Sequence, residues 1–143
     1  MDKIKVIGKQ TLSGKIYISG SKNSVVSLLP AAILSDEVVI EKVPHISDVV
    51  NLEEILRFLN VKFSLESGTI HIDSTEMINK PITEEYSSKL RASYYFMGAL
   101  LGKYKRVKIK MPGGCYLGPR PIDLHLKGFE ALGAKITYED DTY

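Results

Sequence analysis

Residues 37–73 read E-V-V-I-E-K-V-P-H-I-S-D-V-V-N-L-E-E-I-L-R-F-L-N-V-K-F-S-L-E-S-G-T-I-H-I-D, and this stretch decides the fold. It opens with β-branched residues that predict a strand over 37–43. Apolar residues at helical spacing follow and predict an amphipathic helix through Asn60, with Ser47 or Asp48 as its N-cap. The apolar stripe of this helix consists of Val49, Leu52, Leu56 and Leu59.

The end of the same stretch predicts two strands, 61–66 and 69–73, which are joined at Ser67-Gly68 by a hairpin turn. Residues 74–83 then read as a connection. Strands that alternate with helices of this kind predict the α/β (α+β) class.

The region before this stretch predicts two half-buried strands, over 3–7 and 15–19, followed by a largely apolar helix. A polar turn separates the second strand from the helix, and Ser21 or Asn23 can cap the helix N-terminus. Pro30 lies within the helix, so a kink or a break is expected near it.

The region after the stretch predicts a helix over 86–101, which begins at its first residue or only near Arg91. A strand over 105–111 follows, in which apolar and basic residues alternate. Another helix is expected over 121–133, because proline suits a first helical turn and glycine suits the end of a helix. A further strand is expected at 135–138.

The chain contains an internal repeat. The run V-V-I-E-K-V-P at 38–44 aligns with R-V-K-I-K-M-P at 106–112, and F-L-N-V-K-F at 58–63 aligns with A-L-G-A-K-I at 131–136. The second copy is a few residues longer between its strand and its helix. The extra length falls on the loop that carries Cys115, and this is where we expect the function.

The composition is that of an ordinary globular protein, with 143 residues, 44% hydrophobic, 25% charged and a net charge of +2. This charge is too small to indicate nucleic-acid binding, and no apolar run approaches the length of a membrane span. The single cysteine excludes an internal disulfide and the N-terminus is not signal-like, so a soluble cytoplasmic protein is expected. The three histidines are scattered, so no metal and no cofactor are expected.

Cys115 lies in K-M-P-G-G-C-Y-L-G-P-R-P-I-D, residues 110–123, where glycines and prolines exclude a helix or a central strand. A lone cysteine often packs as a small apolar residue, which is the alternative to a functional thiol. Here the neighbours are mainly turn-forming residues and Arg120. They favour a thiol that approaches a bound ligand from a loop.

Three cations accompany this thiol. Lys22 lies at a predicted helix N-terminus, which suits a phosphate or a carboxylate, and the alternative is a solvated polar helix start. Arg91 lies at the start of an apolar helix, where the alternative is that it faces water. Arg120 stands between two prolines just before a helix, where its guanidinium can fork onto phosphate oxygens. One thiol with three cations suits an anionic, phosphorylated substrate and a cysteine that acts as acid or nucleophile.

Three motifs resemble one family of enzymes: S-G-S-K-N at 19–23, L-R-A-S at 90–93 and P-G-G-C-Y-L-G-P-R-P-I-D-L-H at 112–125. With them the chain resembles the N-terminal third of the UDP-N-acetylglucosamine 1-carboxyvinyltransferases (UDP-N-acetylglucosamine enolpyruvyl transferases). The resemblance implies transfer of the enolpyruvyl group of phosphoenolpyruvate to the 3′-hydroxyl of UDP-N-acetylglucosamine. Phosphate is released, and this is the first committed step of peptidoglycan synthesis.

The resemblance also implies roles for individual residues. Cys115 would protonate the methylene carbon of phosphoenolpyruvate, form a covalent adduct with it and be the residue that fosfomycin alkylates. Lys22, Asn23 and Arg120 would bind phosphoenolpyruvate. The UDP-N-acetylglucosamine site would be formed by Asn23, Arg91, Ser93, Arg120, Pro121, Ile122, Asp123 and Leu124.

The fold implied by the resemblance is the inside-out α/β barrel of the enolpyruvyl transferases, of which about two repeated units are expected here. Residues 1–20 would supply strands to the other domain, and residues 21–143 would form two units of the domain with the cysteine loop. The remainder of the protein's own chain would supply the missing units, so this part alone is expected to be inactive. The alternative is a non-catalytic fragment that binds the nucleotide sugar or serves as a structural unit.

Overall fold

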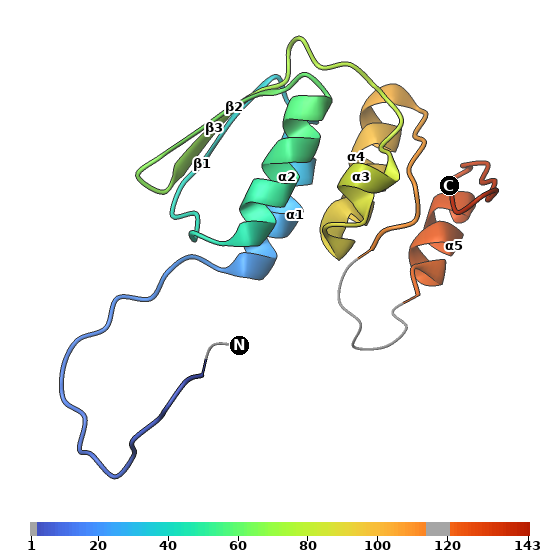
Figure 1. The fold of residues 1–143 in the computed structure, drawn as a ribbon. Coiled ribbons are helices and arrows are strands. Elements are labelled where there is room, and N and C mark those ends of the chain that lie inside the picture. The colour runs from blue at the N-terminus through green and yellow to red at the C-terminus, as the bar shows by residue number, and fades with distance from the viewer. Residues whose placement is uncertain (1–2, 114–120) are drawn as a thin grey trace.

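The computed structural model describes residues 3–113 and 121–143. It places a small sheet beside a group of helices, and the N-terminal segment extends away from both (Figure 1). In chain order the elements are α1 (Lys22–Ala32), β1 (Glu37–Ile40), α2 (Ser47–Phe58), β2 (Lys62–Glu66), β3 (Thr69–Asp73), α3 (Glu84–Ser87), the 3-10 helix η1 (Arg91–Tyr94), α4 (Tyr95–Tyr104) and α5 (Asp123–Ala131).

The three strands form one antiparallel sheet in the order β1-β3-β2. Alternation along β3 buries Ile70 and Ile72 on one face of the sheet and leaves His71 exposed on the other. The helix α2 packs against the sheet through β2. The hairpin predicted over 61–73 is therefore confirmed, and the strand predicted over 37–43 is confirmed in its first four residues.

The core lies where α1 packs against α2 and α4. Burial of its apolar side chains is the main stabilising contribution to the fold. The fully buried residues include Leu29, Ile33, Leu52, Ile55, Leu56, Leu59, Phe96 and Leu100. The apolar stripe predicted for α2 is thus confirmed, and Pro30 lies within α1 two residues before its end. Among the residues described, no helix combines the length and the apolar character needed to cross a bilayer.

The helix predicted over 86–101 is divided into three pieces, α3, η1 and α4. Leu90 interrupts it with an extended backbone (φ −146°, ψ 124°), and this conformation lets the Leu90 side chain join the core. The sequence offered two starting points for this helix, Tyr86 and the neighbourhood of Arg91. The α4 helix begins at Tyr95, just after η1, so the start near Arg91 is the closer of the two. It extends to Tyr104, and Lys105 ends it in a left-handed conformation (φ 58°).

The strands predicted over 3–7 and 15–19 are wrong for this structure. The segment makes no ladder with another part of the described chain and extends away from the helices and the sheet (Figure 1). Its apolar residues stay in solvent, and Ile4 and Ile18 are each 94% exposed. A strand needs the hydrogen-bonding edge of a neighbour, and this segment pairs with none in the described chain. The assignment of residues 1–20 to another domain stays a prediction.

The strands predicted over 105–111 and 135–138 are also wrong. Ile109 makes a single parallel bridge with Ile82 on one side, and its N–H donates to the Tyr143 carbonyl on the other (2.9 Å). These partners pair over too few residues to form a regular strand. The second copy of the repeat therefore contains its predicted helix, α5, without the flanking strands.

The helix N-termini differ in how they are capped. Ser21 caps α1 as predicted, because the Ser24 N–H donates to the Ser21 hydroxyl oxygen (3.4 Å). The N-cap predicted for α2 is wrong, since Ile46 occupies that position and Ser47 and Asp48 lie inside the first turn. Asp48 still favours the helix there, because a carboxylate in the first turn interacts well with the helix dipole.

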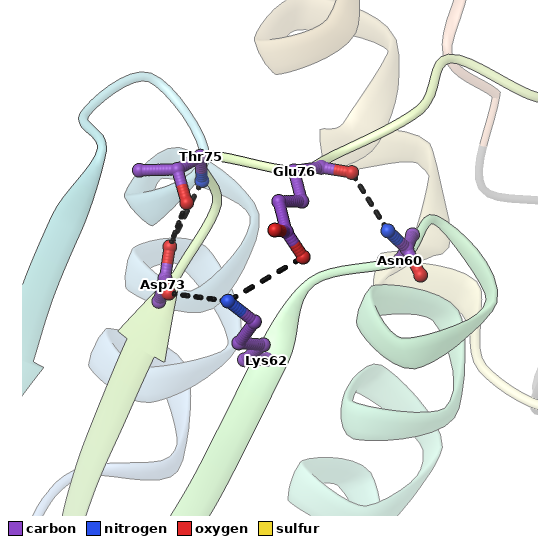
Figure 2. Close-up of polar contacts among 5 residues, drawn as sticks. All are labelled: Asn60, Lys62, Asp73, Thr75 and Glu76. Atoms are coloured by element: carbon purple, nitrogen blue, oxygen red, sulfur yellow. Dashed lines mark hydrogen bonds and ion pairs between the residues drawn. The ribbon is translucent and has the colours of Figure 1, made fainter.

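A cluster of polar side chains ties the open end of the hairpin to the end of α2 (Figure 2). Lys62 Nζ lies 3.2 Å from Asp73 Oδ2 and 3.4 Å from Glu76 Oε2. Asp73 Oδ1 accepts hydrogen bonds from the Thr75 N–H (3.0 Å) and hydroxyl (2.5 Å). Asn60 Nδ2 donates to the Glu76 carbonyl (2.8 Å). The hydrogen bonds from Thr75, followed by the contact with Lys62, lower the pKa of Asp73 to about 2.

Replacing Asp73 with asparagine tests this cluster. The carboxylate has the lower pKa in the folded state, so its contribution is present above about pH 4 and is lost as the pH falls toward 2. We expect Asp73→Asn to lower the melting temperature at pH 7 by about 2–4 °C and to flatten its fall below pH 4. Thermal unfolding followed by circular dichroism measures both effects.

Glu66→Gln, at the other end of the hairpin, is the matched control. Glu66 makes no ion pair among the described residues, so this variant should keep the pH profile of the native chain. An Asp73→Asn profile equal to the native one would contradict the role assigned to Asp73.

Candidate functional site

The start of α1 is shaped by Gly20 and Ser21. A Cβ atom on Gly20 would overlap the carbonyl of Lys42, so only glycine lets the chain pass this close before the helix begins. Ser21 caps the helix, and Lys22 and Asn23 form its first turn. No acidic residue lies in this turn, so the helix dipole and the Lys22 ammonium group both favour an anion here.

Asp48, from the first turn of α2, forms an ion pair with Lys22. The Lys22 Nζ lies 2.5 Å from Asp48 Oδ2, and the side chain of Asp48 is 15% exposed while that of Lys22 is 57% exposed. Sequence reasoning considered Asp48 only as a helix cap and missed this contact, because the two residues come from separate helices. The carboxylate orients the ammonium group, and an incoming anion competes with it.

An open cavity of about 550 Å³ lies beside this ion pair. This volume is within the usual range for sites that bind small molecules. Its wall brings together Lys22 and Asn23 from α1, Arg91 from η1, and Pro121, which precedes α5. Four predicted site residues that are distant in sequence therefore border one space. The other lining residues are Val26, Asp48, Lys89, Leu90, Ala92, Tyr94 and Tyr95.

A smaller cavity of about 210 Å³ adjoins the first, since Arg91 and Pro121 line both. Ile122 and Asp123, which are also predicted site residues, line this second cavity. Met111, Pro112, Leu126 and Tyr143 complete its wall. Arg91 therefore stands between a space bordered by Lys22 and a space bordered by the start of α5.

Other predicted residues do not line these cavities. Ser93 is fully buried, and its hydroxyl donates to the Ser87 carbonyl (3.2 Å), so it supports the wall and does not face the cavity. Leu124 is 74% exposed on α5 and lines neither cavity. Cys115 and Arg120 lie outside the described residues. The binding and catalytic roles assigned to all the site residues stay predictions.

Tyr94 and Tyr95 add an aromatic wall that sequence reasoning missed. Their ring centroids lie 4.5 Å apart, and the ring of His125 meets Tyr94 edge-on at 5.1 Å. Partial burial and a hydrogen bond with Tyr95 raise the pKa of Tyr94 to about 12, although the charge of Arg91 opposes this. Tyr94 is therefore neutral at ordinary pH and can stack or donate a hydrogen bond. The signal in the sequence was A-S-Y-Y-F, which also reads as an apolar helix.

Lys89 is a further cation of the cavity wall that sequence reasoning missed. Its Nζ lies 2.6 Å from Glu54 Oε2, and this hydrogen-bonded pair raises the pKa of Lys89. Arg91, by contrast, makes no ion pair among the described residues and is the cation best suited to bind an anionic ligand. Nowhere in residues 3–113 and 121–143 do three or more His, Cys, Asp or Glu side chains come together as they would to hold a metal ion.

The chain matches known proteins along nearly its whole length. A family model described as EPSP synthase (3-phosphoshikimate 1-carboxyvinyltransferase) matches residues 6–143. The chain is 50% identical over 140 residues to UDP-N-acetylglucosamine 1-carboxyvinyltransferase 2 of Bacillus subtilis (strain 168). It is 53% identical over 140 residues to the protein of the same name from Geobacillus kaustophilus (strain HTA426). Each match covers 97% of this chain and 33% of the relative, so the chain spans about a third of their length.

The fold also matches a solved structure, that of the enolpyruvyl transferase NikO from Streptomyces tendae. The TM-score is 0.77, and the match covers 94% of this chain and 30% of that chain. At 22% identity this likeness concerns the fold alone. It confirms the expected α/β fold of the enolpyruvyl transferase type.

The substitution Asp48→Asn tests whether the Asp48 carboxylate competes with a bound anion for the Lys22 ammonium group. Removing the negative charge makes the ammonium group available, so we expect inorganic phosphate to bind about 2–5-fold more tightly at low salt. The gain should shrink as the ionic strength rises. Titration of phosphate, followed by the NMR shift of the Asn23 amide, measures the affinity.

Lys22→Gln serves as the control and should lose the phosphate-dependent shift. A weaker phosphate affinity in Asp48→Asn would contradict competition. It would mean that Asp48 mainly holds Lys22 in the orientation that binds the anion.

Proposed function

The chain belongs to the EPSP synthase (3-phosphoshikimate 1-carboxyvinyltransferase) family, and from this membership we propose that it forms the thiol-bearing part of a UDP-N-acetylglucosamine enolpyruvyl transferase. The proposed reaction transfers the enolpyruvyl group of phosphoenolpyruvate to the 3′-hydroxyl of UDP-N-acetylglucosamine and releases phosphate, as in the first committed step of peptidoglycan synthesis. The names of the relatives at about 50% identity support the nucleotide sugar as acceptor, in place of the shikimate phosphate of the family's namesake.

The observation that carries the proposal is the cavity in which Lys22, Asn23, Arg91 and Pro121 meet. Both substrates are anionic, so their binding needs cations at the wall. Lys22 stands at a helix N-terminus, and this combination of point charge and backbone N–H groups suits the phosphate of phosphoenolpyruvate. Arg91 suits the diphosphate of the nucleotide sugar, because a guanidinium can donate two parallel hydrogen bonds to phosphate oxygens.

The smaller cavity supports a place for the uridine end of the nucleotide sugar. Pro121 and Ile122 give it an apolar wall against which a planar ring can pack. The Asp123 carboxylate can accept hydrogen bonds from a base N–H or a ribose hydroxyl. In this arrangement Arg91, which lines both cavities, lies between the nucleoside and the reacting groups.

Cys115 is proposed as the acid of the reaction. Its thiol would give a proton to the methylene carbon of phosphoenolpyruvate, which makes the adjacent carbon electrophilic toward the 3′-hydroxyl oxygen. Proton donation requires the neutral thiol, whereas formation of a covalent adduct requires the thiolate. We place the reaction in the cytoplasm, because a single cysteine without a disulfide partner suits a reducing compartment.

A second candidate function is binding of the nucleotide sugar without turnover. The observation that favours it is that the groups proposed to bind the nucleotide sugar, Arg91, Pro121, Ile122 and Asp123, meet at two adjoining cavities of the described residues. On this hypothesis the chain binds UDP-N-acetylglucosamine and releases no phosphate from phosphoenolpyruvate. A phosphate-release assay with both substrates separates the two functions.

Alkylation of Cys115 by fosfomycin tests whether the chain assembles a working half-site. A bound nucleotide sugar would organise the cations around the anionic epoxide, so we expect UDP-N-acetylglucosamine to accelerate adduct formation by about tenfold. Intact-mass spectrometry follows the adduct. Cys115→Ser should show no mass increase, and iodoacetamide reports the intrinsic reactivity of the thiol. Equal fosfomycin rates with and without the nucleotide sugar would contradict the proposal and favour a structural unit.

Arg91→Ala tests the nucleotide-sugar site. Loss of charge-assisted hydrogen bonds should weaken binding of UDP-N-acetylglucosamine by about tenfold or more, as measured by calorimetry. Arg57→Ala is the matched control, because the guanidinium of Arg57 bonds to Glu53 and to the Phe63 carbonyl and lines neither cavity. Equal losses of affinity in the two variants would contradict a binding role for Arg91.

A further inference from the structure

The connection that carries Cys115 begins at a tightly packed crossing of two backbone segments. The Gly113 N–H donates to the Ser87 carbonyl (2.9 Å), and a Cβ atom on Gly113 would overlap the backbone of Ser88. Only glycine therefore allows the chain to pass Ser88 this closely. Two residues farther along the chain stands Cys115, and two peptide units span at most about 7 Å. The crossing is thus the last described point of the chain before the thiol.

Two buried serines hold this crossing together. The Ser93 hydroxyl donates to the same Ser87 carbonyl (3.2 Å), and the Ser87 hydroxyl donates to the Met111 carbonyl (3.4 Å). Both serines are fully buried, so their hydroxyls serve the backbone and do not face a ligand. Ser93 belongs to η1, and η1 also carries Arg91. The crossing is therefore bonded to the element that presents this cation.

The other end of the connection meets the same element. Tyr94, the last residue of η1, receives the ring of His125 edge-on, with an interplanar angle of 66°. His125 lies in the first turn of α5, three residues after Ile122, and Pro121 and Ile122 share a cavity wall with Arg91. No residue of α5 is fully buried, although Leu126 and Phe129 pack partly buried against the core. The Tyr94–His125 pair adds a contact at the start of this helix.

We propose that residues 87–94 are a common anchor for both ends of the connection that carries Cys115. Ser87 and Ser93 fix its beginning, and Tyr94 fixes its end through His125. These four are positioning residues that set the distance of the thiol from Arg91, and none of them needs to touch a substrate. This inference rests on the proposed function, in which Cys115 and Arg91 act on the same pair of substrates.

Gly113→Ala tests the beginning of the connection, because the added methyl group forces the crossing apart. A nitroxide attached to Cys115, the single cysteine, reports the change by electron paramagnetic resonance. We expect the rotational correlation time of the label to fall by about twofold or more in Gly113→Ala. Gly128→Ala is the matched control and should leave the spectrum unchanged, because a Cβ atom there meets no atom within 4 Å.

His125→Ala tests the end of the connection. His125 is exposed, so its replacement leaves no buried group unsatisfied, and the variant is expected to keep the native melting temperature within a few degrees. The label should again move faster. His125→Phe keeps an aromatic edge for Tyr94 and should restore the native spectrum, which a general loss of stability would not do.

Alkylation of the unlabelled chain separates this inference from the proposed function. The acceleration of fosfomycin labelling by UDP-N-acetylglucosamine should drop by about tenfold in Gly113→Ala, while the iodoacetamide rate stays close to the native one. If the native chain itself shows no acceleration, the proposed function fails, and the mobility of the label still decides on the anchor. Unchanged label mobility in both Gly113→Ala and His125→Ala overturns the anchor, even where the native chain responds to the nucleotide sugar.

Discussion

Burial of α1 between α2 and α4 is the constraint from which the candidate site follows. Leu29 and Ile33 are fully buried at these contacts, and a close-packed interior does not let the helix rotate or slide without exposing apolar surface. The direction of its N-terminus is therefore fixed, and Lys22 with it. The same packing sets the first turn of α2 beside α1, where Asp48 reaches Lys22. Apolar packing thus decides where the polar groups meet.

The cations of the larger cavity differ in how their charge is balanced. Lys22 is paired with Asp48 and Lys89 with Glu54, and both partners come from α2. The two pairs reduce the repulsion that three cations would otherwise exert on one another in one wall. An anion binding at Arg91 displaces no carboxylate of the described chain, whereas an anion at Lys22 competes with Asp48. The helix α2 therefore pairs with two of the three cations that line the cavity among the described residues.

The sequence predicts this fold best where the pattern is local. The helix and the hairpin of 37–73 follow from spacing and turn residues a few positions apart, and both form as predicted. The strands at 3–7 and 105–111 fail because a strand depends on a distant neighbour that periodicity does not reveal. Lys22 and Arg91 were predicted as site residues from their types and places in the sequence, whereas Lys89 was missed. The partnership of Lys22 with Asp48 was not, because it is set by helix packing.

The two walls of the site differ in how firmly the core holds them. The part of the site that binds substrate through Lys22 can therefore stay in place while the part that leads to the thiol moves. The wall with Lys22 rests on α1, whose buried residues belong to the core, whereas the wall near Pro121 rests on α5, which has no buried residue. Opening of α5 therefore costs much less free energy than unfolding of the core. Displacement of α5 leaves the packing that positions Lys22 intact. The bonds around Gly113 then matter most, since they join the connection to the well-packed side of the site.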